Sequence, residues 1–137
     1  MILCFWFFCL TKKEDKVSKT REKLDHFTTG FRGVRKGLPD TMKSWSEWHH
    51  KAMASGAVDV KTKEMIALGM ALVLRCPGCI VLHVQACKKL GVTREEILGV
   101  FEVAMVMGGG PTMTYCAELH DALEEFYTQE LPKEGKA

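Results

Sequence analysis

The sequence has almost no excess charge of either sign and no apolar run long enough to cross a membrane. Its 137 residues carry a formal net charge of +2, and no basic stripe interleaved with aromatic side chains is present, so we expect no nucleic-acid partner. The most apolar segment, Met1–Leu10, has about half the length of a membrane-spanning helix. With 47% apolar and 26% charged residues, the composition is that of a globular protein.

The apolar segment also lacks the marks of a secretory signal. No basic segment precedes Met1–Leu10 and no small-residue cleavage site follows it. We expect residues 1–13 to be an N-terminal extension that packs on a partner subunit or is dispensable for function. A membrane-surface anchor is the less favoured alternative. An exposed apolar segment of this kind would be an association site.

The six cysteines do not indicate a disulfide framework. Small secreted domains need such a framework because their cores are small, whereas this chain is long enough to bury an apolar core in one domain. We therefore expect a cytoplasmic protein in a reducing compartment. The expected domain spans residues 14–130, and a flexible tail follows over residues 131–137.

No convincing alternation of period two follows residue 10, which predicts an all-α protein of about six helices. The glycines between Gly30 and Gly37, followed by Pro39, mark the first connection, and Asp40 is a candidate N-cap for the second helix. The stretch Met65–Leu74 is apolar nearly all round, as a buried helix is. The helices are expected over about residues 14–31, 40–56, 60–75, 77–90, 94–107 and 112–128.

Later in the chain, Thr93–Glu96 is a capping box that opens the fifth helix. Gly108–Pro111 breaks the chain before the last helix. Cys87 is expected to be a buried bystander, and Cys116, one turn before His120, a small core residue. The methionines are expected to fill the core as well: Met70, Met105, Met107 and Met113.

The stretch from Cys76 to His83 places two thiols and an imidazole at the start of a helix. Residues three and four apart are neighbours on a helix, so Cys76, Cys79 and His83 form one stripe. Pro77 suits the first helical position and makes Cys76 the expected N-cap. Unpaired N–H groups and the positive end of the helix dipole favour a thiolate there. A dithiol beside a base at a helix start is typical of thiol–disulfide redox chemistry.

Glu64 lies twelve residues before Cys76, at the start of the third helix. If the third and fourth helices form an antiparallel hairpin, Glu64 is roughly 18 Å from the turn and faces the segment His83–Cys87. The order Glu64, His83, Cys79 then suits a proton relay. The carboxylate would orient the imidazole, and the imidazole would exchange a proton with the thiol. An exposed first-turn glutamate is the simpler alternative.

With Glu64, eleven intervening residues and then Cys-x-x-Cys-x-x-x-His, the chain resembles the alkylhydroperoxidase D-like core of the carboxymuconolactone decarboxylase family. The resemblance covers roughly residues 61–110, including the segment LGVTREEILGV. It implies an all-α fold with a central antiparallel hairpin, assembled as a homotrimer or homohexamer with the site near a subunit interface. In one departure, Gly78 stands where the best-studied members carry a second histidine.

The resemblance also implies the roles of the site residues. Cys76 and Cys79 would form a reversible disulfide. Cys79 would attack a peroxide and Cys76 would resolve the sulfenic acid, with Glu64 and His83 as proton relay. The implied function is an antioxidant thiol-dependent peroxidase or disulfide oxidoreductase without a cofactor. Its partners would be a peroxide or disulfide substrate and an external dithiol or thioredoxin-like electron donor.

Other functions stay open for the same residues. Cys76, Cys79 and His83, with Cys87 or Glu64 as the fourth, are a possible set of zinc ligands, although no second Cys-x-x-Cys is present. A non-enzymatic helical module with inert thiols is a further alternative. Decarboxylation of a lactone is disfavoured, because family members with that chemistry generally lack the cysteine pair.

Overall fold

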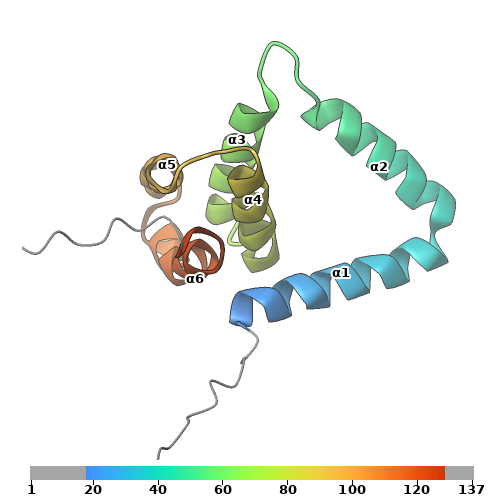
Figure 1. Cartoon of the computed structure of the whole chain (residues 1–137), viewed down its shortest axis with the longest axis horizontal. Helices are drawn as coiled ribbons and strands as arrows, with labels where there is room; N and C mark the ends of the chain where they lie inside the picture. Colours follow the sequence, from blue (N-terminus) through green and yellow to red (C-terminus); the bar gives the residue numbers. More distant parts are fainter. Residues whose placement is uncertain (1–17, 129–137) are drawn as a thin grey trace, which may run out of the picture.

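The computed structural model describes residues 18–128, and over this range the chain forms six helices and no strand (Figure 1). The predicted all-α class is therefore confirmed. The expected N-terminal extension and C-terminal tail lie outside the described residues. The helices are α1 (Lys19–Gly37), α2 (Pro39–Met53), α3 (Val60–Val73), α4 (Pro77–Lys89), α5 (Arg94–Met113) and α6 (Cys116–Tyr127).

Helices α3 to α6 form the body of the molecule, and α1 and α2 form an arm that stands away from it (Figure 1). Within the body, α3 packs on α4 and α5, and α4 packs on α6. α1 crosses the end of the body beside α4 and α6, and α2 returns toward the start of α3. Lys63 of α3 holds the end of α2, since its ammonium donates to the carbonyl oxygens of Ala52 and Ala54 at 2.7 and 2.6 Å.

The start of α1 is fixed to α6 by polar contacts. The Ser18 hydroxyl donates to Glu125 at 2.6 Å, and the Arg21 guanidinium donates to the other carboxylate oxygen of Glu125 at 2.6 Å. Lys23 pairs with Glu118 one turn further along. The Ser18 hydroxyl is the main reason that the pKa of Glu125 lies below its usual value. These contacts set the direction in which the rest of α1 leaves the body.

A turn of three residues, Leu74–Cys76, joins α3 to α4 in the predicted antiparallel hairpin. Arg75 adopts a left-handed conformation with φ 57°. The N–H of Cys76 donates to the carbonyl oxygen of Ala71 at 3.0 Å, as in the Schellman motif that ends many helices. The chain therefore reverses at once, and α4 starts directly beside the end of α3.

The core lies between α3, α4, α5 and α6. Tyr127 is fully buried in this core. Its hydroxyl donates to the carbonyl oxygen of Val92 at 2.9 Å, so both buried polar groups have a hydrogen-bond partner. The aliphatic residues that are almost fully buried come from all four helices: Leu68, Leu72, Ile80, Val81, Val84, Ile97, Leu119 and Leu123.

The predicted starts of three helices are confirmed. Asp59 caps α3, with its carboxylate accepting from the N–H of Thr62 at 2.9 Å. Cys76 caps α4, with Pro77 in the first turn. Thr93 and Glu96 form the expected capping box of α5, with distances of 3.1 and 2.7 Å.

The expected boundaries of the first two helices are wrong. α1 does not end at Phe31 but continues to Gly37, because single glycines in a helix cost only about 1 kcal/mol each relative to alanine. α2 begins at Pro39 with Leu38 as N-cap, and Asp40 lies inside the first turn instead of capping it. Proline is well suited to the first helical position, which moves the start one residue earlier.

Several residues that were predicted to lie in the core are exposed. Ile66, Met70 and Leu74 are 48%, 61% and 75% exposed, so the face of α3 that they share is open in the single chain. Met107 and Met113, predicted as core residues, are also exposed. The nearly uniform apolar pattern of α3 therefore does not mark burial on all sides by this chain alone.

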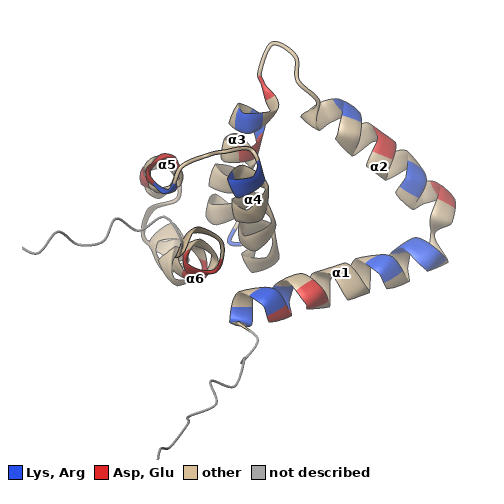
Figure 2. Ribbon diagram, in the orientation of Figure 1, with Lys and Arg blue, Asp and Glu red and all other residues tan. Residues whose placement is uncertain are grey.

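Charged side chains of both signs lie along α1 and α2, whereas the charged residues of α4 are the lysines of its last turn, Lys88 and Lys89 (Figure 2). Among residues 18–128, no single helix is long and apolar enough to span a membrane. The pair α5 and α6, bent by 113° at their junction, passes the same test of length and composition together. The break predicted at Gly108–Pro111 is a kink within α5, where Gly109 departs from helical geometry. The helix continues to Met113 and α6 starts at Cys116, so the expected end of the fifth helix near residue 107 and start of the last helix near residue 112 are wrong.

Candidate redox site

Cys76 and Cys79 are joined in a disulfide at the N-terminus of α4, with 5.2 Å between their Cα atoms. This is the pairing that the sequence resemblance implies. Both residues are half-buried, so neither is sealed in the core. Cys76 has extended backbone geometry as the N-cap, while Cys79 is in the first turn. The pair is therefore accessible from outside and rigidly held by the helix start.

The N-terminus of α4 favours negative charge on a sulfur atom that lies there. The N–H of Cys79 lies 3.4 Å from the sulfur of Cys76 and points toward it. When the disulfide is reduced, the unpaired N–H groups of the first turn and the helix dipole stabilise a thiolate at this place. A dithiol in such a setting is suited to exchange with another disulfide.

Glu64 and His83 face each other across the α3–α4 hairpin. The Nδ1 of His83 and a carboxylate oxygen of Glu64 are 2.7 Å apart, and the two side chains are 25% and 12% exposed. A carboxylate accepts, so Nδ1–H is the donor and Nε2 is left as the basic nitrogen. The predicted contact between Glu64 and His83 is present, and Glu64 is not merely an exposed first-turn residue. Its role as part of a relay stays a prediction.

Cys87 lies one turn beyond His83 and is fully buried. Burial, and after it the negative charge of Glu64, raises the pKa of its thiol to about 11. Cys87 is therefore protonated at neutral pH and unsuited to nucleophilic chemistry. The expectation of a buried bystander is confirmed.

The last helix does not contribute to the site within one chain. Cys116 is exposed, so its prediction as a core residue is wrong; it lies at the first position of α6, after the bend that follows α5. His120 is exposed too and lies near Asp121 and Glu124, at 3.8 and 4.0 Å. In the described part of the chain, no group of three or more histidine, cysteine or acidic side chains is arranged to hold a metal.

One neighbour of the cysteine pair, the helix α1, was not predicted from the sequence. A groove of about 870 Å³ runs under α1 and reaches Gly78, between the two cysteines. One face of α1 lines it, including His26, Phe27 and Phe31. The 3.6-residue spacing of this face was visible in the sequence. Which helix it would meet was not, because the groove joins residues far apart in the sequence, such as His26 and Gly78.

These features define an all-helical protein with a disulfide at a helix N-terminus, next to a carboxylate–imidazole pair. Residues 39–122 match the carboxymuconolactone decarboxylase family, and the chain belongs to that family. The expected membership is thereby confirmed.

Solved structures of the same family share the fold. The apo form of lpg0406, a carboxymuconolactone decarboxylase family protein from Legionella pneumophila, is 42% identical, with a TM-score of 0.75 over 79% of this chain and 96% of that chain. A family protein from Thermotoga maritima (TM1620), for which a part in the antioxidative response has been suggested, is 32% identical, with a TM-score of 0.61 over 66% of this chain and 93% of that one.

Among curated proteins, protein 4 in the cox locus of Paracoccus denitrificans is 36% identical over 72 residues. That match spans 53% of this chain and 65% of the Paracoccus protein. The similarity therefore concerns a shared part of the two proteins.

The different environments of the cysteines predict different reactivity. After reduction, iodoacetamide at pH 8 should modify Cys116 and the Cys76–Cys79 pair within minutes. It should leave Cys87 unmodified, because the raised pKa of this thiol keeps the thiolate fraction very small at pH 8. Mass spectrometry of the peptides measures this, and unfolding in guanidinium provides the control in which Cys87 reacts. Rapid labelling of Cys87 in the folded protein would contradict the assigned burial.

Proposed function

We propose that this protein is a thiol-dependent peroxidase or disulfide oxidoreductase. The observation that carries the proposal is the Cys76–Cys79 disulfide at the start of α4, beside the Glu64–His83 pair on the same hairpin. A dithiol that closes into a disulfide, an adjacent base and a carboxylate that orients the base are the parts this chemistry needs.

In the proposed cycle, His83 takes the proton of Cys79 through Nε2. The Cys79 thiolate then attacks a peroxide oxygen, the O–O bond breaks, and Cys79 becomes a sulfenic acid. Cys76 attacks that sulfur, the disulfide forms and water leaves. An external dithiol, such as a thioredoxin-like protein, returns two electrons by thiol–disulfide exchange and regenerates both thiols.

The two cysteines are assigned different roles on two grounds. The N-cap position favours a thiolate at Cys76, while His83, one turn after Cys79, favours a thiolate at Cys79. The resemblance to alkylhydroperoxidase D-like proteins assigns the attack to Cys79. Cys76 is then the thiol that exchanges with the electron donor, which suits its position as the N-cap of α4.

The antioxidative role suggested for the Thermotoga relative supports the same direction. The family name raises lactone decarboxylation, but a cysteine pair has no step in that reaction. A reducing, cytoplasmic location suits a dithiol that must be regenerated, and we retain it as part of the proposal.

A peroxide-consumption assay with several dithiol donors tests the proposal. The wild-type protein should consume peroxide with at least one donor, whereas Cys79→Ser should lose turnover because no thiolate attacks. Cys76→Ser should stop after one oxidation event per chain, since the sulfenic acid cannot be resolved. Wild-type turnover in both variants would show the redox assignment to be wrong.

The relay makes a separate prediction. Glu64→Gln should keep the fold and both thiols but slow the oxidation of Cys79, and His83→Gln should slow it more, by about 10²-fold or above. The double variant should cost less than the product of the single effects, because the two residues act as one unit. Stopped-flow oxidation of the reduced protein between pH 6 and 8 measures the rates. A wild-type rate in Glu64→Gln would refute the relay while leaving the disulfide chemistry intact.

We also propose that the protein works as a homotrimer or homohexamer. A largely apolar groove of about 720 Å³ lies between α3 and α5, lined among others by Met70, Val103 and Met107. These three residues are 61%, 64% and 75% exposed in the single chain. An open apolar surface of this kind is typical of a face that a second subunit covers.

Light scattering at micromolar concentration should therefore give at least three times the mass of one chain. Met70→Lys, which places a charge in the middle of the apolar face, should lower the mass toward that of a monomer. Val58→Lys is the matched control, since Val58 is exposed in the loop before α3 and should leave the assembly unchanged. A monomeric wild-type protein would sink the proposal.

A further inference from the structure

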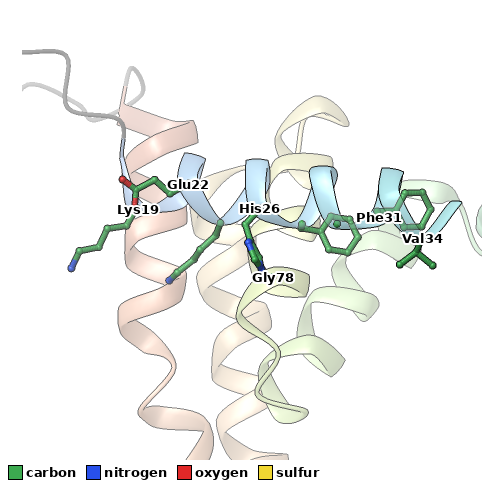
Figure 3. A pocket seen from close by; sticks show the side chains of 9 residues that line it. Lys19, Glu22, His26, Phe31, Val34 and Gly78 are labelled. Atoms are coloured by element: carbon green, nitrogen blue, oxygen red, sulfur yellow. The ribbon is translucent and has the colours of Figure 1, made fainter. Parts of the chain in front are cut away.

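The groove under α1 brings an imidazole to the cysteine motif. Figure 3 shows the side chain of His26 pointing from α1 down to the first turn of α4 at Gly78. A Cβ added at Gly78 would meet nothing within 4 Å, so the groove is open up to the backbone just before Cys79. No other histidine among the described residues lines this groove.

The groove changes character on either side of His26. Toward the start of α1 it is lined by charged side chains, Lys19, Glu22 and Lys23. Toward the end of α1 it is lined by Phe27, Phe31 and Val34, which continue for eight residues, or about 12 Å of helix. Figure 3 shows Gly78 between these two parts. A molecule with an apolar portion can therefore lie along Phe31 and Val34 with its reacting group beside His26.

The proposed peroxidase reaction needs two proton transfers, and the Glu64–His83 pair accounts for one. His83 takes the proton of Cys79, and its Nδ1 is engaged by Glu64. When the O–O bond of an alkyl hydroperoxide breaks, the departing alkoxide is a strong base and must receive a proton as it leaves. A donor for this second transfer has to stand on the side from which the substrate enters.

We propose that His26 is this second proton donor, a catalytic residue of the proposed peroxidase reaction. The inference rests on the proposed function and adds the residue that acts on the leaving oxygen. An imidazole side chain can act as a general acid, and Glu22 lies one turn before His26 on the same face of α1. Lys19 and Lys23 are the other charged groups along this groove, and Lys23 is already paired with Glu118.

The Cys79 thiolate forms a bond to the terminal oxygen of the hydroperoxide, and the O–O bond breaks with its electron pair moving to the alkoxide oxygen. Cys79 becomes a sulfenic acid, so sulfur is oxidised by two electrons and the peroxide is reduced. The His26 imidazolium gives its proton to the alkoxide, which leaves as the alcohol. The next reduction cycle returns a proton from water to His26.

Leaving-group dependence provides the test. Reduced protein is mixed in a stopped-flow instrument with tert-butyl hydroperoxide, whose alkoxide needs a proton, or with peracetic acid, whose acetate does not. His26→Gln should lower the rate constant with tert-butyl hydroperoxide by about 10²-fold and leave that with peracetic acid nearly unchanged. In His26→Ala, added imidazole should restore part of the rate with the alkyl hydroperoxide alone.

Two controls separate the possible outcomes. His50→Gln changes an exposed histidine on α2 that does not line the groove, and it should leave both rate constants unchanged. An equal loss with both oxidants in His26→Gln would indicate a structural role and overturn the inference, and so would an unchanged rate with both. Cys79→Ser is expected to react with neither oxidant. If the wild-type protein also reacts with neither, the proposed function itself fails.

Discussion

The turn at Arg75 is the constraint on which the site depends. Only the three residues Leu74–Cys76 connect α3 to α4, and Arg75 among them is left-handed, so the chain reverses its direction within a short, well-defined turn. The same turn makes Cys76 the N-cap of α4 and sets the register in which Glu64 lies opposite His83. An arginine in this conformation lacks the freedom of glycine and costs about 1–2 kcal/mol, which the packing of α3 on α4 offsets.

The parts of this hairpin were predictable because each depends on local chemistry or on simple geometry. Proline after Cys76 fixes the helix start, and the capping residues Asp59 and Thr93 fix two others. With both helix starts known, a rise of 1.5 Å per residue is enough to place Glu64 near His83. The sequence spacing thus predicted that Glu64 faces the segment His83–Cys87, and in the structure Glu64 contacts His83 at 2.7 Å.

What the sequence did not predict depends on competition between distant parts of the chain. The glycines of α1 indicated a connection, but the helix continues through them while its first turns are fixed to α6 by Ser18 and Arg21. The uniform apolar character of α3 indicated burial, yet it does not distinguish a core from a face that another subunit covers. An apolar composition indicates that a surface favours burial, but it does not indicate whether the same chain or another subunit covers that surface.

The two sides of α4 have different neighbours. On one side α3 packs closely and presents Glu64, which holds His83 in one tautomer beside the cysteine pair. α1 also packs on α4 and leaves a groove that reaches Gly78. A side chain at position 78 would project into that groove, so its absence keeps the approach to the Gly78–Cys79 backbone open. In the proposed reaction, the rigid, closely packed side would serve the activation of the Cys79 thiol, and the open side would serve the entry of a substrate.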